Sequence, residues 1–187
     1  MPFYSDISPI PTRYRGYSMR SRSEGRFGVT FDHLDLRWDY EPQGFTISAL
    51  TNYRPDFWLP DLGVYVEIKG QPPLPRDIAR MAMLCYGRGL VGYIFWGGVP
   101  HPDWSDFDPD GSALAFFPDG TREYGHWICR CRFCGAVGIE KYGWSERLDC
   151  CDQNRETPGH RDTHDDSFIV AAYEAGRGAR AEFGESA

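Results

Sequence analysis

Hydrophobic residues recur along the chain at two different periods, and each period predicts a different kind of element. Spacings of three and four residues predict helices over residues 18–36, 77–88 and 165–182. Runs that are rich in β-branched and aromatic residues, or that alternate in polarity, predict strands. The predicted strands cover residues 37–41, 44–49, 53–59, 64–69, 91–96, 112–117 and 123–128.

This order of elements predicts an α/β protein with one main core and a small appended module. We expect an extended arm over residues 1–17, a core over residues 18–128, and a cysteine-rich subdomain with a terminal helix over residues 129–187. A chain of 187 residues is long enough for this arrangement. Hydrophobic residues make up 41% of the chain and charged residues 25%, which is typical of folded globular proteins.

No segment has the pattern of a membrane span or of a signal peptide. Apolar runs stay short of the roughly 18 residues that a membrane helix needs. The first residues, Met1 to Asp6, lack a basic stretch followed by an apolar one. We therefore expect a cytoplasmic protein with reduced cysteines and no association with membranes.

The net charge of −7 argues against a protein that coats nucleic acid by general attraction, but the charge is unevenly distributed. Residues 1–100 carry 11 Lys and Arg against 10 Asp and Glu, whereas residues 101–187 carry 9 against 17. An arginine-rich stretch contains Arg13, Arg15, Arg20, Arg22 and Arg26. This stretch either faces a polyanion or forms a solvated arm.

A predicted hairpin carries the strongest chemical signal. If residues 60–63 form its turn, Asp56 lies directly opposite Glu67. Opposed carboxylates repel each other, and a divalent cation between them would reverse the sign of the interaction. Lys69 shares the face of Glu67 because side chains alternate along a strand. A lysine there can orient an attacking water and offset charge that develops on a phosphate. The alternative is an exposed cross-strand charge cluster.

Glu24 adds a third acid to this picture. It shares a helix face with Phe27 and Phe31, which should press against the sheet. A buried carboxylate without a partner is costly, and a nearby cation would remove that cost. The alternative is a Glu24 side chain that reaches solvent or pairs with Arg20.

Three stretches together resemble the PD-(D/E)XK pattern of restriction-like endonucleases: Glu24, Pro55-Asp56 and Glu67-Ile68-Lys69. The first predicted helix, three of the strands after it, the second helix and the next strand are similar in order to that family's core (helix, three strands, helix, strand) over residues 18–97. An acid in the first helix occurs in branches such as Holliday-junction resolvases and transposon end-cutting nucleases. The sequences of residues 53–60 and 66–70 also resemble those of small nucleases encoded by bacteriophages.

The resemblance implies a restriction-endonuclease-like fold and a metal-dependent endonuclease that hydrolyses DNA phosphodiester bonds. It implies that Asp56 and Glu67 bind Mg²⁺ or Mn²⁺ together with the Ile68 carbonyl, and that Lys69 helps the attacking water. The family acts mostly on DNA, whereas the residues themselves specify only a phosphodiester, so RNA stays open. A homodimer is compatible with the sequence.

Four arginines are candidate contacts for the phosphates of a bound strand: Arg20, Arg22, Arg76 and Arg80. The first two belong to the arginine-rich stretch, and the last two lie four residues apart on one side of the predicted second helix. Arg76 and Arg80 are also compatible with ordinary surface charge.

Five of the six cysteines lie within residues 129–151, which predicts a structural zinc site. Cys131 and Cys134 have the spacing of a zinc knuckle, and Cys150 and Cys151 follow at a distance common for paired knuckles. We expect these four thiolates to bind the ion. A site closed by thiolates leaves no open position for water, so the ion would be structural.

Other assignments stay open for the cysteine-rich segment. Adjacent side chains diverge in regular structure, so Cys129, His160 or His164 could replace one of the adjacent pair as the fourth ligand. The six cysteines could also be thiols or disulfides without a metal. Cys85 lies in a predicted helix among apolar residues and is expected in the core.

Two rival functions use the same fold differently. A binding module could keep the nuclease fold and the zinc site without catalysis, and the intact set of two acids and a lysine argues against it. A zinc-dependent hydrolase could use histidines, but the candidates lack the paired spacing of such sites. Those candidates are His101, His126, His160 and His164.

Overall fold

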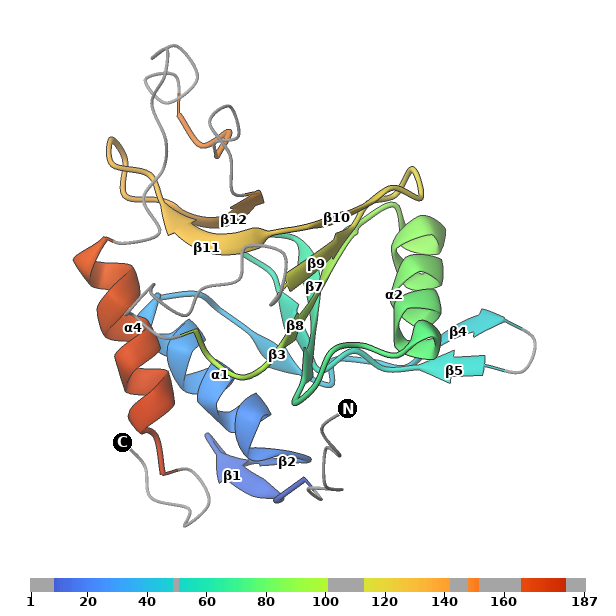
Figure 1. Cartoon of the computed structure of the whole chain (residues 1–187), viewed down its shortest axis with the longest axis horizontal. Coiled ribbons are helices and arrows are strands. Elements are labelled where there is room, and N and C mark those ends of the chain that lie inside the picture. The colour runs from blue at the N-terminus through green and yellow to red at the C-terminus, as the bar shows by residue number, and fades with distance from the viewer. Residues whose placement is uncertain (1–8, 49–50, 101–112, 142–147, 152–165, 181–187) are drawn as a thin grey trace, which may run out of the picture.

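The computed structural model describes residues 9–48, 51–100, 113–141, 148–151 and 166–180. Its centre is a mixed sheet of six strands in the order β10-β9-β8-β7-β6-β3 (Figure 1). The strands are β3 (Asp39–Tyr40), β6 (Phe57–Leu59), β7 (Val64–Lys69), β8 (Val91–Trp96), β9 (Ala113–Phe116) and β10 (Arg122–Tyr124). β7 and β8 run parallel, and the other neighbours are antiparallel.

Smaller sheets and helices surround this sheet in the described part of the chain. The two-stranded sheets are β1 (Thr12–Tyr14) with β2 (Tyr17–Met19), β4 (Phe45–Ser48) with β5 (Thr51–Tyr53), and β11 (His126–Arg130) with β12 (Val137–Lys141). The helices are α1 (Arg22–His33), α2 (Pro75–Arg88) and α4 (Ser167–Gly178). None of these helices is long and apolar enough to cross a membrane. The prediction of a mixed α/β protein is confirmed.

Two hydrophobic cores lie on opposite faces of the sheet, because side chains alternate along each strand. Val64, Val66 and Ile68 of β7 belong to the core that contains Phe27 and Phe31 of α1. That core also includes residues of α4, so α1 and α4 cover one face (Figure 1). Tyr65 of β7 belongs to the second core, which contains the buried residues of α2. The alternation predicted for β7 is therefore confirmed.

Several boundaries differ from the sequence predictions. The expected arm over residues 1–17 is wrong for its described part, since residues 12–14 form β1 and pair with β2. The expected strand 53–59 is two strands, because Pro55 has no N–H for a ladder and Tyr53 pairs with β4 instead. The expected strand 123–128 is also two strands, separated at Gly125 with φ 83°. The expected domain boundary after residue 128 falls inside β11.

The contact between α1 and α4 depends on one glycine. A Cβ atom on Gly176 would lie 2.0 Å from Thr30 Oγ1 and 2.8 Å from the Arg26 carbonyl oxygen. Thr30 is fully buried and already donates to that carbonyl. The two helices can therefore approach closely only where α4 has no side chain.

We predict that Gly176→Ala destabilises the protein by about 2 kcal/mol, because the added methyl overpacks this contact. Thermal and urea unfolding would measure the change. Gly178→Ala is the control, since a Cβ there meets no atom within 4 Å. Equal stability of the two variants would contradict the close approach.

Candidate active site and cysteine cluster

The β6–β7 hairpin has the register that the sequence predicts. Phe57 pairs with Val66, Trp58 with Tyr65 and Leu59 with Val64. The turn is closed by two N–H groups that donate to the Leu59 carbonyl, and Gly63 takes the φ of 66° that the tight reversal needs. This register brings Asp56, just before β6, to the end of the sheet where Glu67 lies.

Asp56 is the most deeply buried acid of the site, with 1% of its surface exposed. Its Oδ2 accepts a hydrogen bond of 2.7 Å from the Ile68 N–H, and its Oδ1 forms an ion pair with the Arg20 guanidinium. Burial raises the pKa of Asp56 well above its usual value, and the charges of Glu67 and Glu24 raise it further. The Ile68 N–H and Arg20 oppose this rise. Asp56 is therefore a carboxylate whose ionised form needs a cation.

Glu67 and Lys69 form a second pair on β7. Lys69 Nζ lies 2.6 Å from Glu67 Oε1 and 3.9 Å from Asp77 Oδ1 of α2. Burial disfavours the charged ammonium, but the nearby carboxylates, Glu67 first, outweigh it and raise the pKa of Lys69. Tyr53 donates its hydroxyl to Glu67 Oε2 at 3.0 Å. Lys69 thus stays protonated, so it can donate a hydrogen bond but cannot accept a proton.

Glu24 is buried at the start of α1, where local geometry holds it. Ser21 caps the helix by accepting from the Glu24 N–H, and its hydroxyl donates to Glu24 Oε1 at 2.7 Å. Glu24 Oε2 accepts from the Tyr40 hydroxyl at 2.6 Å and from the Arg20 N–H at 3.0 Å. Burial and the Glu24 carboxylate raise the pKa of Tyr40, which therefore stays a donor.

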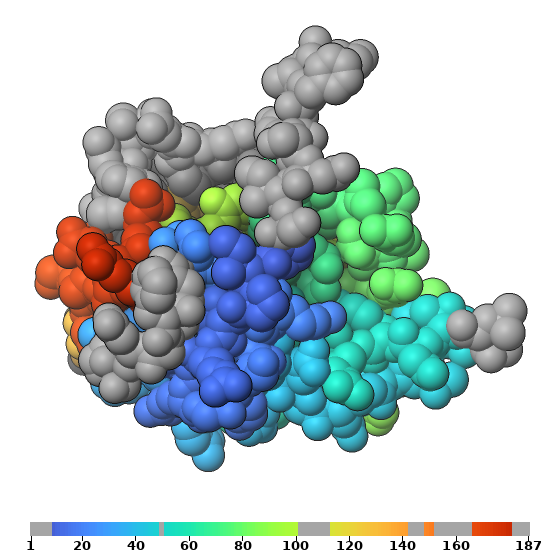
Figure 2. Space-filling view, turned by 90° about the horizontal axis from the view of Figure 1, so that it is seen from below, coloured from blue at the N-terminus to red at the C-terminus, as the bar shows by residue number. Residues whose placement is uncertain are grey.

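These acids lie near one another, yet each is already satisfied by donors from the protein. They come from the N-terminal segment and from the region of β4 to β7, which lie side by side on the face shown in Figure 2. In the part of the chain that the structure describes, the only group of three or more His, Cys, Asp or Glu residues with converging ligand atoms consists of cysteines. A divalent cation would have to displace one of the present donors.

The predicted arginine contacts fall into two groups. Arg20 points its guanidinium at Asp56 and Glu41, and Arg22 is half-buried in the first turn of α1. Arg76 and Arg80 are exposed on α2, and neither forms an ion pair within the described residues. The Ile68 backbone contributes its N–H to Asp56, whereas a metal contact of its carbonyl stays a prediction.

Sequence reasoning missed three residues of this site: Tyr40, Glu41 and Tyr53. Glu41 accepts from Arg20 Nε and from Arg54 Nη1, each at 3.0 Å. Nothing in the sequence singles out these residues, because their contacts depend on how β3 and β5 approach the hairpin. The one local signal is that Tyr53 lies three residues before Asp56.

The four predicted cysteines form one cluster. The Sγ atoms of Cys131, Cys134, Cys150 and Cys151 all lie within 4.8 Å of one another. The Cys131–Cys151 and Cys134–Cys150 distances are 3.9 Å and 3.5 Å. A tetrahedral zinc ion with Zn–S bonds of ≈2.3 Å needs Sγ atoms about 3.8 Å apart. The cluster therefore suits a structural metal such as zinc.

The turn between β11 and β12 shapes the first half of the cluster. Gly135 has a φ of 76°, and its N–H donates to the Cys131 carbonyl at 2.8 Å. This bends the chain so that Cys131 and Cys134 face the same side. A hydrogen bond from the Ala136 backbone, followed by contact with Cys150, lowers the pKa of Cys134. A lowered thiol pKa favours the thiolate that a metal needs.

The structure also places the other cysteines named in the sequence analysis. The adjacent Cys150 and Cys151 both join the cluster, so the expected divergence of neighbouring side chains does not apply here. Cys129 is buried with Sγ 3.8 Å from the Gly138 carbonyl and is not a member. All six cysteines lie in the described residues, where no disulfide forms, and Cys85 is in the core as predicted.

Histidines contribute nothing to the described site. His126 is buried beside the rings of Tyr93 and Phe117. His101, His160 and His164 lie outside the described residues, so their predicted alternatives as ligands or catalytic groups stay predictions.

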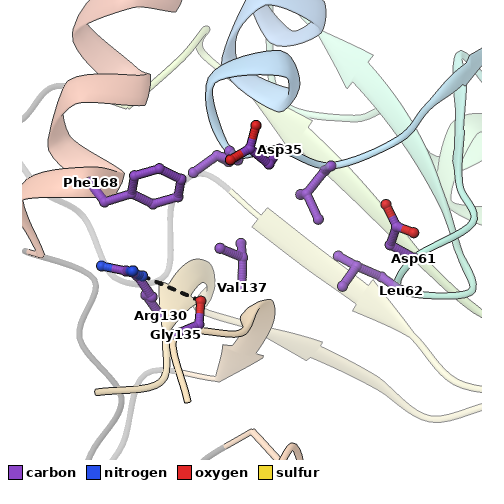
Figure 3. Close-up of a pocket in the computed structure, with 9 residues that line it drawn as sticks. Asp35, Asp61, Leu62, Arg130, Gly135, Val137 and Phe168 are labelled. Atoms are coloured by element: carbon purple, nitrogen blue, oxygen red, sulfur yellow. Dashed lines mark hydrogen bonds between the residues drawn. The ribbon is translucent and has the colours of Figure 1, made fainter. Parts of the chain in front are cut away.

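A pocket of ≈350 Å³ lies where α1, the β6–β7 turn, the β11–β12 sheet and α4 meet (Figure 3). Asp61 and Leu62 line it from the turn, at the end of the hairpin opposite Asp56 and Glu67. Arg130 donates to the Gly135 carbonyl at 3.3 Å and lies over the Phe168 ring. These contacts join the cysteine cluster to the core.

Comparisons with protein families, with curated proteins and with solved structures found no match.

We predict that Asp56→Asn removes a pH-dependent loss of stability. Folding raises the pKa of Asp56, so stability is highest below the usual carboxyl pKa of about 4 and falls as the pH rises through the folded-state value. Without added Mg²⁺, the unfolding free energy of the wild type should fall more between pH 4 and pH 8 than that of the variant. Urea unfolding across this range would test it, and parallel curves would contradict it.

We predict about one zinc ion per chain, since the four thiolates complete a tetrahedral site. Elemental analysis of the purified protein would measure the content, and Cys131→Ser should lower both the zinc content and the melting temperature. Cys129→Ser changes a buried cysteine outside the cluster and should keep the zinc. A stable wild-type protein without metal would refute the site.

Proposed function

We propose that the protein is a divalent-metal-dependent endonuclease that hydrolyses DNA, with a PD-(D/E)XK site on a restriction-endonuclease-like core. The observation that carries the proposal is the buried Asp56 carboxylate beside Glu67, Glu24 and Lys69 at one end of the sheet. An acid with 1% exposure and a raised pKa is stabilised by a cation at Oδ1, the oxygen that Arg20 contacts.

The chemistry of the donor set fits a hard divalent ion. Asp56 and Glu67 offer carboxylate oxygens, which Mg²⁺ and Mn²⁺ prefer, and Glu24 and the Ile68 carbonyl are further candidate ligands. A bound ion would supply the means to activate water and to stabilise charge on a phosphate. The Asp56 Oδ2 bond to the Ile68 N–H fixes the carboxylate against the strand, so such an ion would bind at Oδ1 and displace Arg20 from it.

Lys69 supplies positive charge at the same place. It stays protonated between Glu67 and Asp77, so its role is to donate to a phosphate oxygen or to the attacking water. Asp77 belongs to the first turn of α2, which therefore borders the site. Arg76 and Arg80 extend from this helix into solvent. They are therefore available to contact the backbone phosphates of a bound strand.

One observation favours a non-catalytic binding protein as the second candidate. Every carboxylate of the site already has a protein donor, so the ion pairs with Arg20 and Lys69 would by themselves stabilise a fold that only binds a partner. The zinc-bound module would then present the binding surface. Activity measurements separate this candidate from the nuclease.

We predict that the purified protein cuts DNA with Mg²⁺ or Mn²⁺ and that Asp56→Ala and Lys69→Ala each lower the rate at least about a hundredfold. Plasmid, linear, branched and single-stranded DNA, with RNA as a parallel substrate, would show the preferred nucleic acid on gels. Both variants remove a charge from the proposed site.

Asp61→Ala is the matched control, because Asp61 is an acid of the same hairpin that pairs with Arg37 at the opposite end. It should cut at the wild-type rate. No cleavage of any substrate by the wild type with either metal would favour the binding protein.

A further inference from the structure

Arg20 forms an ion pair with Asp56 Oδ1, the carboxylate oxygen that the Ile68 N–H does not contact. It lies between β2 and α1, and its guanidinium contacts Asp56 Oδ1 while its Nε lies 3.0 Å from Glu41 Oε1. Its backbone N–H donates to Glu24 Oε2 at 3.0 Å and to the Tyr40 hydroxyl at 3.1 Å. One residue therefore contacts three acids of the site, two through its guanidinium and one through its backbone N–H.

We propose that Arg20 is a displaceable counter-ion, which neutralises Asp56 until a divalent cation binds and is then released to a phosphate of the nucleic acid. This inference rests on the proposed nuclease function. It makes Arg20 a link between the binding of metal and the binding of substrate.

The side chain of Arg20 can leave while its backbone stays. The side chain is 58% exposed, whereas Met19 beside it is 1% exposed and anchors the chain in the core. The two hydrogen bonds of the Arg20 N–H do not involve the guanidinium. Of the two groups that hold Asp56, the Ile68 N–H is fixed in β7 and only the guanidinium can move away.

Glu41, the other acid that the Arg20 guanidinium contacts, has a second ion-pair partner. Glu41 Oε2 also accepts from Arg54 Nη1 at 3.0 Å, so Glu41 keeps an ion pair when Arg20 departs. No half-buried acid is left unpaired by the movement. Releasing the guanidinium therefore costs its contacts with Asp56 and Glu41, and the incoming cation replaces the first of them.

The charges of the site favour the exchange. Glu24, Asp56 and Glu67 place three negative charges near the proposed metal position, which favours a divalent cation there. A guanidinium that stayed at Asp56 Oδ1 would lie beside that cation and be repelled by it. A planar guanidinium forms strong paired hydrogen bonds with phosphate, so the substrate backbone is its favourable next partner. Because each binding event favours the other, metal and nucleic acid should bind cooperatively.

The first test measures Mn²⁺ binding by calorimetry to zinc-loaded protein without nucleic acid. Arg20→Ala should bind Mn²⁺ about threefold to tenfold more tightly than the wild type, because its competitor for Asp56 is gone. Arg20→Gln keeps most of the side chain but not the charge, and it should bind Mn²⁺ more tightly by a similar factor. This variant keeps the test valid if the alanine variant does not fold. Arg54→Ala removes the other partner of Glu41 and should not tighten binding.

The second test measures DNA binding by fluorescence anisotropy in a Lys69→Ala background, which keeps the DNA intact. Mg²⁺ should strengthen DNA binding by the single variant, and this gain should shrink when Arg20→Gln is added. In a plot of the logarithm of the DNA-binding constant against the logarithm of the salt concentration, the slope should become shallower by about 0.9, which corresponds to the loss of one phosphate contact.

The counter-ion role would be overturned if folded Arg20→Gln bound Mn²⁺ no more tightly than the wild type. If the wild-type protein nevertheless cleaved DNA, the nuclease proposal would stand. Absence of both Mn²⁺ binding and cleavage in the wild type would overturn the nuclease proposal and the counter-ion role with it.

Discussion

A carboxylate that water hardly reaches is stable only where donors and positive charges surround it, and Asp56 imposes this requirement on several elements at once. β7 contributes the Ile68 N–H, and the segment before α1 contributes Arg20. The pair of Glu67 and Lys69 lies beside them. The register of the β6–β7 hairpin, the start of α1 and the first turn of α2 must therefore all be correct for this one group to be buried.

Much of this arrangement could be predicted from the sequence, because it depends on local rules. The turn at residues 60–63 fixes the register, and the register places Asp56 and Glu67 at the same end of the hairpin. Alternation along β7 places Lys69 with Glu67, and the cap at Ser21 positions Glu24. The spacing of the cysteines likewise identified the four that cluster.

The missed features depend on contacts between distant parts of the chain. Arg20 lies 36 positions from Asp56, and only the packed fold shows that its guanidinium points at the acids. The break at Pro55 detaches Tyr53 from the expected strand and turns its hydroxyl toward Glu67. The small sheet of β1 and β2 was hidden because prolines and glycine made its sequence look irregular.

The position of α4 in the chain has a consequence for how the protein is made. α4 follows the cysteine cluster in the sequence but packs on α1, where Gly176 fits against Thr30. During synthesis on the ribosome, the apolar surface that α4 covers stays open until residues 167–178 have emerged. The core that α1 and α4 share can thus be completed only after the cysteine-rich module has been translated.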